Sequence, residues 1–265
     1  MKIFISVDIE GVTGVTSRPE TVLGQEEHRK AARQMTLETL AAIEGALEAG
    51  ASEIYVKDGH ATGRNLDMSD FPKEVKLIRD WTGEPVSMMA GLDESFDGAV
   101  YIGYHAEAYS DGNPLAHTIN SSMINSIRVN GAYASEFFLN AHRAAELKVP
   151  SIFIAGDRAI CESAKEISRG IETVAVKEGR GGATISISPQ LACDLIRAGV
   201  KRAVENRGQC RLDLADSYEV EMAYKDHAKA YRACFYPGVR RLDAKTVGFT
   251  ASSMLELMTT RMFIM

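Results

Sequence analysis

Several features that mark particular protein classes are scarce in this chain of 265 residues. The four cysteines are scattered without a Cys-x-x-Cys pair, so neither a disulfide framework nor a zinc site built from thiolates is expected. No apolar run is long enough to span a membrane, and the first residues lack the apolar segment of a signal peptide. The 30 Lys and Arg residues are outnumbered by 36 Asp and Glu residues, which argues against a nucleic-acid partner. We therefore expect a cytoplasmic protein that binds neither nucleic acid nor membrane.

The order of apolar patterns along the chain predicts an α/β fold. Alternating apolar residues from Ile3 to Ile9 predict a buried strand. The pattern turns helical between about Glu27 and Ala49, and Gly50 is a suitable helix end. A second apolar run, Ile54 to Val56, completes a strand–helix–strand unit, which implies parallel pairing with a right-handed crossover.

Further elements repeat this alternation, and the composition changes near residue 205. We expect strands at 75–78, 99–103, 127–129, 151–155 and 173–176, and helices at 136–147, 163–167 and 189–205. Beyond that point we expect strands at 218–222 and 246–250, and helices at 223–234 and from Ser253. The predicted architecture is a mainly parallel sheet flanked by helices in a body formed by residues 1–205, with a smaller α+β portion formed by residues 206–265.

Three of the predicted strands end in side chains that bind metals. Asp8 and Glu10 lie two residues apart at the end of the first strand, and therefore on one face of it. His60 and His105 each follow a later strand. Because the carboxyl ends of parallel strands meet at one edge of a sheet, we expect these side chains to lie close together. Glu136, in the first turn of its predicted helix, is a fifth candidate.

This set of donors indicates which metal is bound and how many ions. Carboxylates and imidazoles without thiolates suit zinc, manganese or cobalt. Three carboxylates and two imidazoles exceed the ligands of one tetrahedral zinc, but they fit two ions that share a carboxylate. Such a pair activates a water molecule near neutral pH and polarises a carbonyl or phosphoryl oxygen. The predicted reaction class is metal-assisted hydrolysis.

His117 is a further candidate, for a role other than metal binding. It follows the strand of His105 after a polar loop. From there it could protonate a leaving amine or stabilise an oxyanion, and the spacing also leaves open a loop histidine without a role. His28 and His227 lie in polar helical stretches, and His142 lies on a helix without a neighbouring ligand type, so we expect all three to be structural.

These candidate residues fall within five short motifs: Ser6-Val7-Asp8-Ile9-Glu10-Gly11, Lys57-Asp58-Gly59-His60, Gly103-Tyr104-His105, Ala116-His117 and the segment from Glu136 to Asn140. Together the motifs resemble the D-aminopeptidase family of bacterial dipeptide-transport operons, and the resemblance covers nearly the whole chain. It implies a dinuclear zinc peptidase whose zinc ligands match Asp8, Glu10, His60, His105 and Glu136. It also implies that His117 acts in catalysis and that the subunits assemble as a homodecamer of two stacked pentamers.

One segment departs from the pattern of that family. After the strand at 151–155 the family leads us to expect Gly-Asp-Asp, whereas this chain has Gly156-Asp157-Arg158. If this loop contacts the substrate, the specificity of this chain differs from that of the family. Residues 206–245 match the family only loosely.

One main hypothesis and two alternatives follow from these residues. The main hypothesis is an aminopeptidase that uses a metal-bound hydroxide to release the N-terminal residue of small peptides, which include D-amino-acid peptides. A two-metal phosphoesterase would use the same ligands and would need basic residues for the phosphate, for which Arg158 and Lys57 are available. A non-catalytic protein that binds a metal or a small ligand is the third possibility. The sequence sets neither the preference for D or L residues nor the physiological metal.

Overall fold

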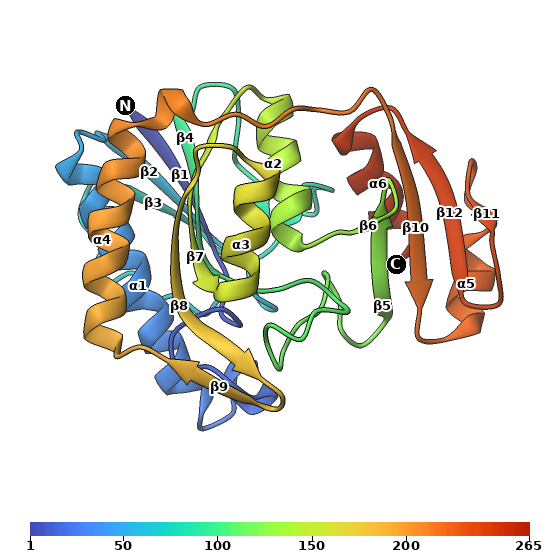
Figure 1. Cartoon of the computed structure of the whole chain (residues 1–265), viewed down its shortest axis with the longest axis horizontal. Coiled ribbons are helices and arrows are strands. Elements are labelled where there is room, and N and C mark those ends of the chain that lie inside the picture. The colour runs from blue at the N-terminus through green and yellow to red at the C-terminus, as the bar shows by residue number, and fades with distance from the viewer.

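The computed structural model describes residues 1–265, which form two sheets with flanking helices (Figure 1). The helices are α1 (His28–Glu48), α2 (Glu136–Glu146), α3 (Arg158–Ile167), α4 (Pro189–Glu205), α5 (His227–Ala233) and α6 (Met254–Ile264), with short 3-10 helices η1 (Arg18–Thr21), η2 (Ser87–Met89) and η3 (Arg207–Gln209). The strands are β1 (Lys2–Val7), β2 (Glu53–Asp58), β3 (Val75–Ile78), β4 (Gly98–Tyr104), β5 (Ile124–Val129), β6 (Ala132–Tyr133), β7 (Ser151–Asp157), β8 (Glu172–Arg180), β9 (Ala183–Ser186), β10 (Tyr218–Tyr224), β11 (Arg240–Arg241) and β12 (Thr246–Ala251). None of the helices combines the length and the apolar character that a membrane crossing requires.

The first sheet has its strands in the order β3-β2-β1-β4-β7-β8-β9. Neighbouring strands are parallel throughout, except for the antiparallel pair of β8 and β9. The chain adds β2 and β3 on one side of β1, and β4, β7 and β8 on the other. The strand order therefore reverses between β1 and β4. In open α/β sheets, ligands bind in the crevice beyond the strand ends at such a reversal.

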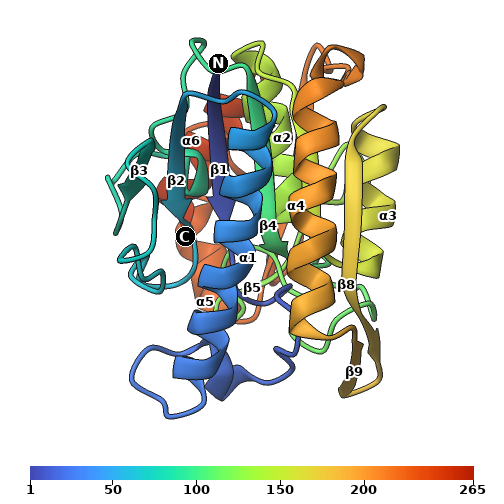
Figure 2. The same ribbon diagram turned by 90° about the vertical axis from the view of Figure 1, so that its left-hand side faces the viewer.

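Helices cover both faces of this sheet (Figure 2). Ile3, Ile5 and Val7 of β1 belong to one apolar cluster together with residues of α1 and α4. Phe4 faces the other side and belongs to a second cluster that includes Phe137 of α2. Successive strand residues point to opposite faces, so both faces of β1 are buried, as is usual for the interior strand of a parallel sheet.

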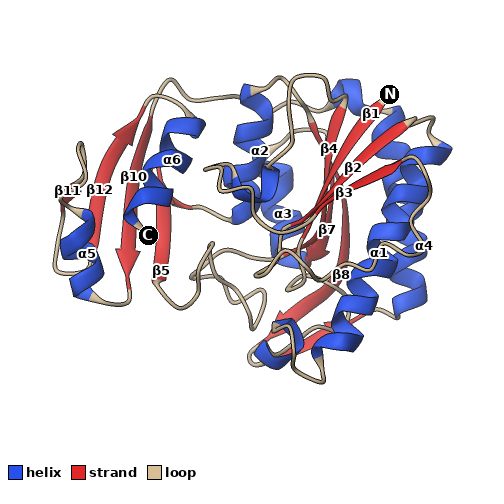
Figure 3. Ribbon diagram, turned by 180° about the vertical axis from the view of Figure 1, so that it is seen from behind, coloured by secondary structure: helices blue, strands red, loops and turns tan.

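The second sheet is antiparallel, in the order β11-β12-β10-β5-β6, and has a core of its own with α5 and α6 (Figure 3). Helix α2 contributes to both cores, because Phe137 packs in the core of the first sheet and Leu139 in that of the second. The prediction of a mainly parallel α/β sheet with a smaller C-terminal portion is confirmed. The division at residue 205 stays a prediction, since the second sheet also takes β5 and β6 from residues 124–133.

Several elements differ from the prediction: α3 begins at Arg158 and not at residue 163, β8 extends to Arg180, and the short strands β6 and β11 are additional. The helix predicted over 223–234 begins only at His227, because β10 keeps its alternation of buried and less buried residues up to Tyr224. The Asp226 side chain then accepts a hydrogen bond from the backbone N–H of Ala228 and caps the helix. Strand β9 was not predicted, because its residues are mostly exposed and carry no apolar pattern.

Gly103, near the end of β4, is a position where a side chain would be strongly destabilising. Its φ of +70° lies in the left-handed region, and a Cβ atom would lie 2.1 Å from the backbone oxygen of Asp8. Overpacking and backbone strain each cost about 1–3 kcal/mol, so we expect Gly103→Ala to lower the free energy of unfolding by about 3 kcal/mol. Urea unfolding measures this, with Gly208→Ala as the control, because nothing lies within 4 Å of the Cβ position there. Equal unfolding midpoints for the two variants would contradict the prediction.

Candidate metal centre

The predicted metal ligands lie just beyond the carboxyl ends of β1, β2 and β4, next to the reversal of strand order. Asp8 and Glu10 follow β1, which ends at Val7, so they belong to the turn after the strand and not to the strand itself. The Asp8 Oδ1 accepts a hydrogen bond from the backbone N–H of Ile9 at 2.8 Å, which fixes the carboxylate at the start of this turn. His60 lies two residues beyond β2, and His105 directly follows β4.

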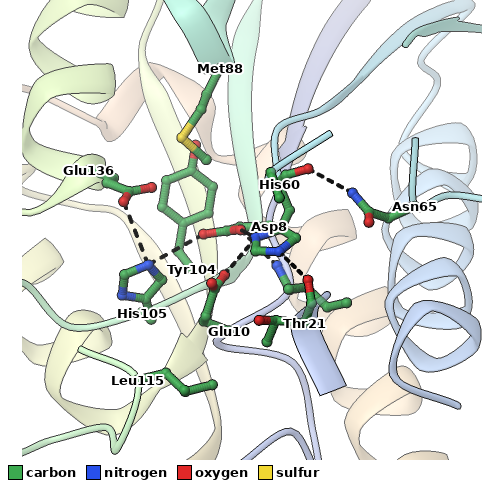
Figure 4. A network of polar contacts seen from close by, with 12 residues as sticks. Asp8, Glu10, Thr21, His60, Asn65, Met88, Tyr104, His105, Leu115 and Glu136 are labelled. Carbon is green, nitrogen blue, oxygen red and sulfur yellow. Dashed lines mark hydrogen bonds and ion pairs between the residues drawn. The ribbon is translucent and has the colours of Figure 1, made fainter. Parts of the chain in front are cut away.

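The structure brings these side chains together in one buried cluster (Figure 4). His60 Nδ1 lies 3.1 Å from Asp8 Oδ1 and 2.9 Å from Glu10 Oε2. His105 Nε2 lies 3.5 Å from Asp8 Oδ2 and 3.7 Å from Glu136 Oε1. The predicted metal ligands therefore lie close together, as expected from the strand ends. Their role as metal ligands stays a prediction.

Two groups of three potential ligands can be distinguished in this cluster. In each group one ligand atom from every member lies within 4.8 Å of the others; the groups are Asp8, Glu10 and His60, and His105, His117 and Glu136. Asp8 faces both groups, since its Oδ1 points to His60 and its Oδ2 to His105. A carboxylate in this position can bridge two ions.

Backbone carbonyl oxygens fix the orientation of all three imidazoles. His60 Nε2 lies 2.7 Å from the oxygen of Thr21, His105 Nδ1 lies 2.8 Å from that of Ala106, and His117 Nδ1 lies 2.8 Å from that of Leu115. A carbonyl oxygen only accepts hydrogen bonds, so each of these nitrogens carries the hydrogen. When a ring is in its neutral form, its other nitrogen presents a lone pair to the cluster, which is the arrangement typical of metal-binding histidines.

Two buried polar atoms in the cluster have no hydrogen-bond partner, namely Glu10 Oε2 and His105 Nε2. Glu10 Oε2 is close to His60 Nδ1, but without the geometry of a hydrogen bond. An unpaired buried acceptor costs free energy, so such atoms call for a ligand. Carboxylate oxygens and imidazole lone pairs that converge on one point fit a divalent cation, and this donor set suits zinc.

Burial and the charges of neighbouring groups shift the pKa values of several residues in the cluster. Burial raises the pKa of Asp8 to about 7, and the negative charge of Glu10 adds to this rise. Burial works against a charged His105, but the carboxylates of Glu136 and Asp8 outweigh it and raise its pKa to about 9. In the same way Glu10 and Asp8 hold the pKa of His60 well above its ordinary value. The negative charge of the carboxylates, which stabilises the protonated histidines, also attracts a metal cation.

A second layer of hydrogen bonds holds the loop that carries His60. The Asp58 carboxylate accepts hydrogen bonds from the backbone N–H groups of Asn65 and Leu66, at 2.6 and 2.8 Å. The Asn65 amide donates to the backbone oxygen of His60 at 2.8 Å, and its oxygen contacts His28 Nε2 at 3.0 Å. His28 is thus part of this hydrogen-bond layer, and its structural role stays a prediction.

Buried groups also fix the turn after β1 and the start of α2. Lys177, which is buried, donates to the backbone oxygens of Glu10 and Val15. Ser135 caps α2 by accepting a hydrogen bond from the backbone N–H of Phe138. Glu136 is thus the first residue of a capped helix, where the helix dipole stabilises its charge.

A cavity of about 370 Å³ adjoins the cluster. Its lining includes Asp8, Glu10, His60, His117 and Glu136, together with Arg18, Trp81, Ser87, Met88 and the segment 119–122. A larger cavity of about 1070 Å³ beside the start of α1 contains none of the predicted site residues in its lining. The smaller cavity is therefore the candidate substrate site.

Sequence patterns did not identify Arg18, Trp81 or the segment 119–122. These residues belong to loops or to a short 3-10 helix, and no periodic pattern relates them to the strand ends.

In contrast, the two basic residues considered for phosphate binding lie elsewhere. Arg158 forms an exposed ion pair with Glu178 at 2.8 Å, and the buried Lys57 donates to the backbone oxygens of Asp58 and Asp80. Neither of them lines the cavity.

Three comparisons relate this chain to known proteins. A family model described as D-aminopeptidase matches residues 1–263. A D-aminopeptidase of Bacillus subtilis (strain 168) is 30% identical over 262 residues, which covers 97% of this chain and 93% of the relative. The solved structure of the Zn-dependent D-aminopeptidase DppA from Bacillus subtilis, a self-compartmentalizing protease, superimposes with a TM-score of 0.93 at 28% identity, covering 100% of this chain and 96% of that one.

Proposed function

The chain belongs to the D-aminopeptidase family, and on that premise we propose that it is a zinc-dependent aminopeptidase that releases the N-terminal residue of small peptides, including D-amino-acid peptides. The observation that carries this proposal is the position of Asp8. Its two carboxylate oxygens face His60 at 3.1 Å and His105 at 3.5 Å, between two groups of potential ligands. This arrangement supports two zinc ions in each subunit.

The proposed ligands divide between the two ions. Asp8, Glu10 and His60 would hold one zinc, and His105 and Glu136 would hold the second, with Asp8 placed to be shared by both. Bound zinc supplies Lewis-acid chemistry, because it lowers the pKa of water and polarises the scissile carbonyl group.

His117 is the proposed catalytic residue. Its Nδ1–H donates to the backbone oxygen of Leu115, so the neutral ring presents an unprotonated Nε2, which lies 3.7 Å from Glu136 Oε1. Burial and the neighbouring His105 lower the pKa of His117, which favours this neutral form. In this proposal Nε2 first accepts a proton from the attacking water and then donates it to the nitrogen of the leaving amine. Proton donation, which the sequence suggested, is thus the second of two steps.

We also propose that the subunits assemble into a homodecamer, as the resemblance to the family implies. The solved relative is a self-compartmentalizing protease, and such proteases enclose their sites by self-association. Exposed aromatic residues for this purpose lie in and beside helices α5 and α6, where Phe235, Phe263 and Tyr231 are 71%, 60% and 54% exposed. Large exposed apolar groups often mark interaction surfaces.

The cytoplasmic location stays a prediction from the sequence.

Metal removal and a substrate panel test the proposed function. The protein is treated with a chelator, and zinc is then added back while hydrolysis of D-alanyl and L-alanyl dipeptides and of p-nitrophenyl phosphate is followed. We expect dipeptide hydrolysis to disappear on chelation and to return with about two equivalents of zinc, without comparable phosphate ester hydrolysis. Full activity of the metal-free protein would refute the proposal. Hydrolysis of the phosphate ester alone would favour the phosphoesterase, and zinc binding without any turnover would favour the non-catalytic alternative.

A further inference from the structure

Arg18 is the only lysine or arginine side chain that lines the cavity beside the metal centre. It is the first residue of η1 and is exposed, so its guanidinium group is accessible from the cavity. The remaining charged lining residues are carboxylates and histidines of the candidate centre. The cavity thus carries the metal-binding cluster and one separate cationic group.

Two segments that hold the cluster also hold Arg18. At the other end of η1, the backbone oxygen of Thr21 accepts the hydrogen bond from His60 Nε2 at 2.7 Å. On the opposite side, the Arg18 guanidinium donates to Ser121 Oγ. Ser121 lies two residues after Ile119, whose backbone N–H donates to Glu136 Oε1 at 2.7 Å. Arg18 therefore connects a segment that orients His60 to a segment that orients Glu136.

The conformation of Ile119 supports a functional role for the second segment. Its φ is +67°, in a region that β-branched residues rarely adopt. Such strain persists only where the surrounding contacts impose it, and it is concentrated at functional sites. Here the contacts that impose it include the bond to Glu136. Because Ile119 is bonded to Glu136, the backbone from Ile119 to Ser121 has a defined position relative to the cluster. The Ser121 hydroxyl group, which binds Arg18, shares this position.

An arginine at this place can distinguish between the two ends of a peptide. A short peptide has two kinds of oxygen that a metal centre attracts, namely those of its carbonyl groups and those of its terminal carboxylate. A guanidinium group binds a carboxylate through two parallel hydrogen bonds, and Ser121 occupies only part of its donors. The Arg18 guanidinium would hold the terminal carboxylate of the peptide away from the metal-binding cluster, so that a carbonyl group of the peptide lies at the cluster instead.

We propose that Arg18 binds the C-terminal carboxylate of a dipeptide or tripeptide and so selects short, free peptides as substrates. This inference rests on the proposed function and specifies its substrate class. The cavity volume of about 370 Å³ is consistent with it, because this is near the lower limit for small-molecule sites.

Pairs of substrates that differ only at the C-terminus test the inference. We compare D-Ala-D-Ala with its C-terminal amide, and the corresponding L pair, on the zinc-loaded protein. The wild type should show a KM about tenfold lower for the free acid, as a charge-assisted contact to a carboxylate implies. In Arg18→Gln the ratio of the two KM values should fall toward one, and in Ser121→Ala, which removes the anchor of Arg18, it should take an intermediate value. Arg29→Gln is the matched control, because Arg29 is exposed on α1 and does not line this cavity.

Binding measurements separate failure of this inference from failure of the proposed function. Isothermal titration gives the Kd values of the same pairs for the zinc-loaded protein if they are not hydrolysed, and for the zinc-loaded His117→Ala variant, in which we expect hydrolysis to be slow, if they are. The inference would be supported if the wild type binds the acid more tightly than the amide and Arg18→Gln does not. This holds even if neither peptide is hydrolysed, because absence of hydrolysis would count only against the proposed aminopeptidase activity. Equal affinity of the wild type for acid and amide, or an unchanged ratio in Arg18→Gln, would overturn the inference.

Discussion

Asp8→Ala is expected to lose both zinc ions and to lower kcat/KM at least about a thousandfold. Asp8 is the only residue that faces both groups of ligands, with one oxygen near His60 and the other near His105. Metal ions contribute several kcal/mol of transition-state stabilisation, and each 1.36 kcal/mol corresponds to a factor of ten in rate. Metal analysis of the purified variant and steady-state kinetics with a D-alanyl dipeptide measure the two effects.

Variants of the other carboxylates make this prediction specific. Glu10→Ala and Glu136→Ala each remove a ligand of one group, so each should lose about one equivalent of zinc, whereas Asp8→Ala should lose about two. Asp111→Ala is the control, because Asp111 is exposed and outside the cluster. If Asp8→Ala kept two zinc ions, or lost no more than Glu10→Ala does, Asp8 would not be a bridging ligand.

His117→Ala is expected to lower kcat by about 10²–10⁴ while the zinc content stays at the wild-type value. The His117 ring stacks on that of His105 with 4.5 Å between the ring centroids, and its unprotonated Nε2 faces the cluster. Loss of a proton-transfer group slows the chemical step and leaves the metal ligands in place. Stopped-time assays at saturating substrate, together with metal analysis, give both quantities.

The zinc content of this variant decides between two roles for His117. Its position close to His105 and Glu136 also suits a metal ligand. Loss of one zinc equivalent in His117→Ala would assign it to that role and would refute its assignment as a proton-transfer group only. His227→Ala is the control, because the side chain of His227 is 73% exposed and lies outside the cluster.

The main sheet could be predicted from the sequence because its strands are short apolar runs separated by helical patterns. Burial on both faces makes β4 and the middle of β7 nearly continuously apolar, and β1 has apolar residues at Ile3, Ile5 and Val7; such patterns predict strands without any knowledge of their neighbours. The pattern of a single strand does not show which sheet the strand joins. For this reason β5 could be predicted as a strand, but its pairing with β10 could not.

The candidate site was predictable to the extent that its residues follow strands. Asp8, His60 and His105 come after parallel strands, and the topology of such a sheet brings strand ends together. Arg18 and Ile119 have no such relation to the sheet. Their positions depend on tertiary contacts between loops, such as the bond from Arg18 to Ser121, and local sequence does not encode those contacts.

The carbonyl oxygens that orient the three imidazoles have a consequence for the evolution of this enzyme. The acceptors at Thr21, Ala106 and Leu115 belong to the main chain, so they are present whichever amino acid occupies those positions. Drift at positions 21 and 115 therefore leaves the tautomers of His60 and His117 unchanged, provided that the backbone keeps its path. A library that randomises these two positions should therefore yield folded variants that still bind their metals.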